Sequence, residues 1–126
     1  MHSVEDIPSD NHLYRRVPED CYDPSSGKCT EGAFLLREKI NEHYLSVDWA
    51  EKTNINKSCV NPINKQKFKI AELLVQDPLD LKLSVDHIPT KHNYAHSGIS
   101  GKDLFDEVLR FIRASELAEK GIMRFP

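Results

Sequence analysis

The sequence has 126 residues and contains only 5 glycines and 3 cysteines. Phosphate-binding and dinucleotide-binding loops need closely spaced glycines, and no such loop is present. The cysteines Cys21, Cys29 and Cys59 are odd in number, and their spacings are not those of a zinc site. We therefore interpret them as reduced thiols. The sequence predicts no metal site and identifies no cofactor.

Long hydrophobic runs are also missing, since no window approaches the roughly 18 apolar residues of a membrane span. The segment from Met1 to Asp10 carries three acids and lacks the basic start and apolar run of a signal peptide. We expect a cytoplasmic protein without a membrane contact. Its length suits a single domain over residues 1–126, with residues 1–10 as a flexible leader.

Neither an excess of one charge nor a nucleophile motif is present. The formal net charge is -3, with both signs mixed along the chain, so we expect no binding to duplex nucleic acid. No G-x-S-x-G sequence occurs, and the adjacency of His96 and Ser97 does not make a catalytic triad. The sequence does not decide whether the protein is an enzyme.

Two segments alternate between polar and apolar residues, as a half-buried strand does. In the segment Leu13 to Val17, Leu13, Arg15 and Val17 share one side, which leaves His12, Tyr14 and Arg16 on the other. In the segment from His43 to Trp49, the polar side carries Tyr44, Ser46 and Asp48. If these two polar sides lie on the same face of one sheet, they combine a guanidinium, a phenol and a hydroxyl.

Further elements follow from shorter patterns. We expect a strand from Gly32 to Arg37, a short helix beginning at Trp49 and a surface loop over residues 54–62. Residues 68–75 could form a helix by propensity, but we prefer a pair of strands, over residues 68–75 and 81–88, around a turn at Pro78. A helix is expected over residues 101–119, with a capping Ser100, a stop at Gly121, and a buried stripe of Leu104, Phe105, Val108, Leu109, Phe111 and Ile112. These elements predict an α+β fold, a small and mostly antiparallel sheet of about five strands covered by the C-terminal helix.

Three of the six histidines fall within ten residues, at His87, His92 and His96. They follow an alternating run, and the end of a strand is a common position for chemistry because the strand fixes the geometry and the loop gives access. A histidine can donate or accept a proton near neutral pH. We take His87 and His96 as candidate catalytic residues; the alternative is that each is a surface residue or a satisfied core residue.

The candidate ligand-binding residues are Tyr14, Arg15, Arg16 and Ser46. A guanidinium matches a phosphate or carboxylate with two parallel hydrogen bonds, and the phenol and hydroxyl can orient the bound group. The alternative is that both arginines are solvated or paired with the numerous acids.

Several of these segments together resemble a group of small uncharacterised bacterial proteins. The resemblance lies in Leu13-Tyr14-Arg15-Arg16, in Ala33-Phe34-Leu35-Leu36-Arg37, in Leu45-Ser46-Val47-Asp48-Trp49, and in His87-Ile88-Pro89 and Ala95-His96-Ser97. The resemblance implies a bacterial, cytoplasmic protein and adds weight to Arg15, Ser46, His87 and His96. No activity follows from it.

We therefore expect a polar Arg/Tyr/His site for an anionic small molecule or a nucleotide, with acid/base chemistry as an additional role. The alternative is a non-catalytic interaction subunit of a bacterial defence or toxin–antitoxin system, which would bind a protein partner. The small size, the acidic balance and the absence of a catalytic motif favour this alternative.

Overall fold

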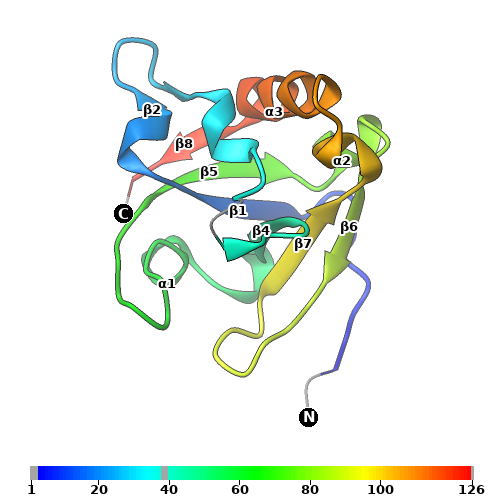
Figure 1. Cartoon of the computed structure of the whole chain (residues 1–126). Helices are drawn as coiled ribbons and strands as arrows, with labels where there is room; N and C mark the ends of the chain where they lie inside the picture. Colours follow the sequence, from blue (N-terminus) through cyan, green and yellow to red (C-terminus); the bar gives the residue numbers. More distant parts are fainter. Residues whose placement is uncertain (1–2, 38–39, 126) are drawn as a thin grey trace.

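The fold is built on a six-stranded antiparallel sheet with the spatial order β6-β7-β4-β1-β5-β8 (Figure 1). It is taken from a computed structural model that describes residues 3–37 and 40–125. The strands are β1 (His12–Val17), β4 (Leu45–Trp49), β5 (Lys69–Leu74), β6 (Ser84–His87), β7 (His96–Ser100) and β8 (Ile122–Arg124). A separate hairpin pairs β2 (Tyr22–Asp23) with β3 (Lys28–Cys29). The predicted α+β class is confirmed.

Helices lie on both sides of the sheet. The α-helices are α1 (Ile55–Ser58), α2 (Gln76–Asp80) and α3 (Leu109–Lys120), and the 3-10 helices are η1 (Glu19–Cys21), η2 (Glu31–Phe34), η4 (Ala50–Lys52) and η5 (Lys102–Phe105). Helix α3 covers one face, above β5 and β8, as predicted for the C-terminal helix, and α1 lies on the opposite face (Figure 1). We call the side under α3 the core face and the other side the open face.

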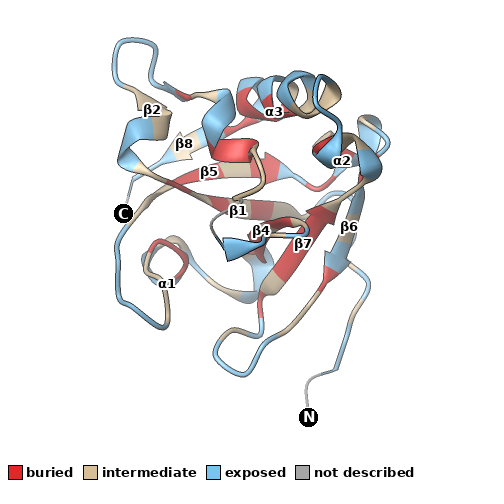
Figure 2. Cartoon of the chain, viewed as in Figure 1, coloured by how far each residue is buried: buried red, intermediate tan, exposed pale blue. Residues whose placement is uncertain are grey.

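The alternation predicted for β1 and β4 sorts their side chains between the two faces. In β1, Leu13, Arg15 and Val17 are buried on the core face, whereas the residues between them are half-buried. The core face continues through the neighbouring strands of the sheet, which carry many of the buried residues (Figure 2). Its buried side chains include Leu13, Val17, Leu45, Val47, Leu73 and Ile99. Each large apolar side chain buried there contributes roughly 1.5–3 kcal/mol to folding.

The predicted strand from Gly32 to Arg37 is wrong. Residues 31–34 form the 3-10 helix η2, and residues 35–37, the last ones described before the gap, are not paired to the sheet. Ala33 and Phe34 are fully buried and pack beneath α3. A short apolar run therefore enters the core as a helical turn, a case that periodicity alone does not separate from a strand.

The C-terminal helix is shorter than predicted, because it is interrupted. The segment begins as η5, breaks at Asp106, and resumes as α3 at Leu109. The Asp106 carboxylate accepts hydrogen bonds from the backbone N–H groups of Val108 and Leu109, at 2.9 and 2.8 Å, and these bonds lower the pKa of Asp106. Gly121 ends the helix, as predicted.

The strands expected around Pro78 are present as β5 and β6, but they do not form a pair. Pro78 lies inside α2, and β1, β4 and β7 separate β5 from β6 in the sheet. The expected surface loop over residues 54–62 contains the single-turn helix α1, whereas the short helix expected after Trp49 is present as η4.

The N-terminal segment contacts the edge of the sheet at β6. The Glu5 N–H donates to Nδ1 of His87 at 3.0 Å, and the Tyr94 hydroxyl donates to the Glu5 carboxylate. Residues 3–10 of the predicted leader are thus held by contacts, while its first two residues lie outside the described ones. Within residues 3–37 and 40–125, none of the helices combines the length and the apolar character needed to cross a membrane.

Candidate functional site

The open face brings together the polar residues of three neighbouring strands. Tyr14 in β1 is paired with Asp48 in β4, and Asp48 is paired with His96 in β7. Because side chains alternate along a strand, Arg16 and Ser46 point to this same side. The register thus confirms that the polar sides of the first two predicted strands share one face, and it places His96 beside them.

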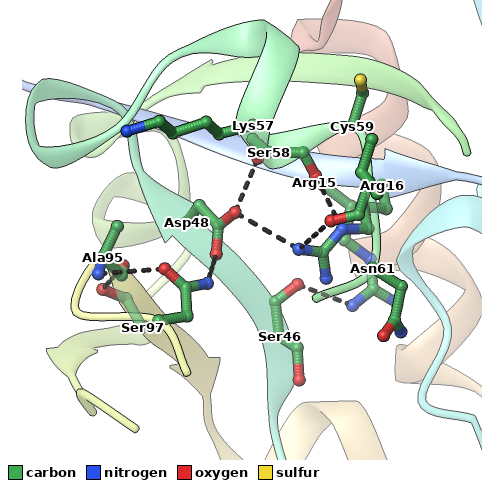
Figure 3. Close-up of polar contacts among 12 residues, drawn as sticks. Arg15, Arg16, Ser46, Asp48, Lys57, Ser58, Cys59, Asn61, Ala95 and Ser97 are labelled. Atoms are coloured by element: carbon green, nitrogen blue, oxygen red, sulfur yellow. Dashed lines mark hydrogen bonds and ion pairs between the residues drawn. The ribbon is translucent and has the colours of Figure 1, made fainter. Parts of the chain in front are cut away.

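Asp48 is the centre of a hydrogen-bond network on the open face (Figure 3). Its side chain is 5% exposed. One carboxylate oxygen accepts from the Ser58 hydroxyl at 2.6 Å and lies 3.6 Å from Nη2 of Arg16; the other accepts from the Asn93 amide at 2.7 Å. Every oxygen of this buried carboxylate is therefore bonded, as a buried charge requires.

The same network attaches two loops to the sheet. Nε of Arg16 donates to the Ser58 carbonyl at 2.7 Å, which holds α1 and the loop after it above β1. Asn54 caps α1 by accepting from the Lys57 N–H. On the other side, the Asn93 carboxamide accepts from the Ala95 N–H and so shapes the loop that leads into β7.

A pocket of about 220 Å³ opens between these two loops, above Asp48. Its lining contains Lys57 and Lys65 from the first loop and His92 from the second. Lys65 donates to the Pro62 carbonyl, while the side chains of Lys57 and His92 bond to no other residue within the described part of the chain. Among the described residues that line the pocket, Asp48 carries the only carboxylate, so the pocket is more positive than the acidic chain around it.

His96 lies on the open face with one tautomer fixed by its surroundings. Its Nδ1 is 2.8 Å from the Ile88 carbonyl, which can only accept, so Nδ1 carries the proton. In the neutral ring, Nε2 is then an acceptor. The Tyr44 ring contacts the imidazole edge-on, with 5.8 Å between the ring centroids.

Two candidate ligand-binding residues, Tyr14 and Ser46, are half-buried on the open face, outside the pocket lining. Burial and the nearby Glu72 raise the pKa of Tyr14. The backbone carbonyl of Ser46 accepts from Arg15 at 2.9 Å and its N–H donates to Glu42 at 3.2 Å. The backbone of Ser46 is thus held in place by the buried side chains of Arg15 and Glu42.

Arg15 is not on the open face, and its guanidinium has partners in the core. It is 1% exposed, donates from Nε to the Ala33 carbonyl at 2.8 Å, and pairs with the Glu42 carboxylate at 3.2 Å. Burial lowers the pKa of Arg15, and the carboxylate opposes this effect. Burial alone would raise the pKa of Glu42, but Arg15 and two backbone N–H groups lower it below its ordinary value.

His87 is likewise on the core face and is 3% exposed. Its Nδ1 accepts from the Glu5 N–H, and its Nε2 donates to the Tyr94 carbonyl at 2.7 Å. The rings of Trp49 and Tyr94 pack edge-on against it. The structure therefore separates His87 from His96, which point to opposite faces of adjacent strands.

No match to known proteins was found. Comparison with family models, with curated proteins and with solved structures each gave none. The resemblance to small bacterial proteins therefore stays a prediction, and the function has to be inferred from the geometry. Among the described residues, no group of three or more His, Cys, Asp or Glu side chains is arranged to hold a metal ion.

Sequence reasoning missed several residues of this site: Asp48, Lys57, Ser58, Lys65, His92 and Asn93 line the pocket or hold its loops. The alternation of β4 placed Asp48 on the polar side, and His92 belongs to the histidine group. The two lysines lie in a polar loop whose position depends on Arg16, and nothing in the local pattern indicates that this loop meets the one carrying His92.

Proposed function

We propose that the protein binds an anionic small molecule, or the phosphate of a nucleotide, in the pocket above Asp48. The observation that carries the proposal is the convergence of Lys57, Lys65 and His92, from two separate loops, around one small pocket in a chain of net charge -3. Cationic side chains placed around a concave site attract and hold anions. The Asp48 carboxylate is bonded on both oxygens and so acts as a structural support.

The size of the pocket limits what enters it. Pockets that enclose a drug-sized ligand measure about 300–1,000 Å³, whereas this one is about 220 Å³. It suits a phosphate, a sulfate or a small carboxylic acid. The sugar and base of a nucleotide would extend beyond it, onto the open face where Tyr14 and Ser46 lie.

Arg16 has a positioning role in this proposal, since it holds the loop of α1 in place and stands beside Asp48. His96 does not line the pocket. It is the candidate acid/base group for the part of a ligand that extends onto the open face, because its proton on Nδ1 leaves Nε2 as an acceptor there. Arg15 and His87 have no role in the proposed site, because both side chains are buried and hydrogen-bonded on the core face. The protein would act in the cytoplasm of a bacterium.

The binding proposal is tested by thermal shift and calorimetry with inorganic phosphate and with a nucleoside monophosphate at low salt. Binding to the native state raises the melting temperature by mass action. The double variant K57A/K65A removes two charged donors, each worth about 1.5–3 kcal/mol, and should weaken binding at least a hundredfold. The matched control is K120A, an exposed lysine at the end of α3. Equal binding by the wild type and K57A/K65A would refute the proposal.

The acid/base role is tested separately on His96→Asn, by phosphate release from nucleoside monophosphates. We expect the variant to retain binding and to lose turnover. Full turnover in His96→Asn would remove the histidine from the mechanism, and the absence of turnover in the wild type would leave a binding protein without catalysis.

A second candidate function is that of a non-catalytic interaction subunit, as in a bacterial defence or toxin–antitoxin system. It is favoured by one observation: several large apolar side chains of η5 and α3 are exposed. In that case a protein would cover this surface, and the K57A/K65A substitutions would leave the association unchanged.

A further inference from the structure

Four large apolar side chains of the C-terminal segment are exposed, although the sequence predicted a buried stripe there. The exposed fractions are 58% for Phe105, 66% for Val108, and 45% for both Phe111 and Ile112. Ile40, on the neighbouring segment, is 65% exposed. These five residues, which we call the apolar patch, form part of a surface outside the anion pocket.

The exposure follows from which side of α3 faces the sheet. The side chains that α3 buries against the sheet are Ala114, Leu117 and Ala118, all in the C-terminal two thirds of the helix. Val108 and Ile112 are four residues apart and lie on the outer side, where Ser115 continues the same row. The outer row of Val108, Ile112 and Ser115 is therefore an exposed ridge.

A groove of about 1010 Å³ is lined from this same segment by Leu104, Phe105, Arg110 and Phe111. Among the described residues that line it, seven are apolar and eight are polar or charged, the latter including Arg37, Glu42 and Arg110. The apolar ones are Leu35, Leu36, Ile40, Phe68, Leu104, Phe105 and Phe111. The apolar patch and this groove are continuous, because Ile40, Phe105 and Phe111 belong to both. An interface between two identical subunits related by a two-fold axis requires a self-complementary surface of this kind.

The area also agrees with what a stable dimer needs. A half-exposed large side chain presents roughly 100 Å², so the apolar patch offers about 500 Å². A standard interface covers about 800 Å² per partner, and about 65% of a homodimer interface is apolar, which corresponds to about 520 Å². A patch of this size lies within the upper range seen on monomers, where it is often functional.

We propose that the apolar patch is the interface through which two copies of this chain form a dimer, the ridge of each copy entering the groove of the other. The anion pocket lies between other loops, so the dimer does not depend on the ligand proposed above. Burial of aromatic and aliphatic side chains at the centre of the interface supplies most of its stability.

The test is the mass of the full chain in solution, by light scattering after size exclusion and by sedimentation velocity. Interfaces of standard size bind with micromolar or lower dissociation constants, so we expect a dimer at about 100 µM. The variant V108K/I112K places two charges on the ridge and should weaken association at least a hundredfold. The control V4K/L74K changes two other exposed apolar residues, 72% and 42% exposed, and should remain dimeric.

A second variant, Ser115→Arg, adds bulk to the ridge without removing any apolar group, and it should also yield a monomer. Circular dichroism confirms that each variant is folded. A wild type that stays monomeric at about 100 µM would overturn the proposal, since a standard interface is half formed well below that concentration. A dimer that survives both ridge substitutions would overturn it as well.

Discussion

The ion pair between Arg15 and Glu42 allows a sharp test, because both groups are buried and each has a defined set of partners. The side chains are 1% and 4% exposed, and the carboxylate also accepts from the backbone N–H groups of Arg37 and Ser46. Replacing Glu42 by Leu leaves a buried guanidinium without its counter-ion. Breaking a buried pair in this way costs about 3–5 kcal/mol, a large part of the 5–15 kcal/mol that stabilises a typical domain.

The magnitude is measured by urea unfolding, followed by the fluorescence of Trp49, the single tryptophan, which is 4% exposed. Arg15→Met should be similarly costly, because it leaves the carboxylate buried and alone. In the double variant neither charge remains, so its cost should fall below the sum of the two single costs by about 1–3 kcal/mol. The control Lys28→Ala breaks an exposed pair with Glu119 and should change stability by less than about 1 kcal/mol.

If Glu42→Leu cost less than about 1 kcal/mol, the pair would not stabilise the fold as argued. If Arg15→Met kept full stability and lost anion binding, the original assignment of Arg15 to the ligand site would be restored.

Three further predictions follow from other contacts. Folding lowers the pKa of Glu42 from its ordinary value of 4.5, so the stability that Glu42 contributes is complete above that pH and is lost as the pH falls toward the folded pKa. Glu42→Gln should therefore remove this part of the acid destabilisation measured by urea unfolding at several pH values. An unchanged pH profile would contradict the assignment. A Cβ at Gly98 would lie 2.5 Å from Cδ1 of Tyr44, so Gly98→Ala should cost about 1–3 kcal/mol by thermal unfolding, and Gly98→Ala in a Tyr44→Ala background should cost clearly less. His87→Ala removes the acceptor of the Glu5 N–H and a buried ring, and should cost about 2–4 kcal/mol without altering phosphate binding; a stable variant that no longer binds would return His87 to the site.

Strands with a clear period of two could be predicted from the sequence. In β1 the alternation places Leu13 and Val17 inside and Tyr14 and Arg16 outside, as observed. The failure at Gly32 to Arg37 has a physical cause, because an apolar run of this length can be buried either as a strand or as a helical turn. Only its contact with α3 decides between the two, and that contact joins segments far apart in the chain.

The candidate site could be predicted only in part, for two reasons. Arg15 alternates with apolar residues, which by itself indicates the core, but its partner Glu42 is 27 residues away and cannot be recognised from the pattern. The apolar residues around Val108 and Phe111 do recur with the spacing of a helix, as predicted, but they are not buried. However, an apolar stripe shows only that a helix has an apolar side, and whether that side meets the sheet depends on the break at Asp106.

The place of β1 in the sheet has a consequence for synthesis on the ribosome. β1 is synthesised before its partners β4 and β5, and α3, which covers the core face, is synthesised after all three. At a translation rate of roughly 5–20 residues per second, the apolar side of β1 stays uncovered for about 5–20 s, until residues up to 120 have been synthesised. During this time the backbone of β1 is unpaired and Leu13 and Val17 are exposed, so β1 can associate with other chains. We therefore expect the yield of folded protein to depend on chaperones that bind exposed strands, even though the finished sheet is fully paired at its centre.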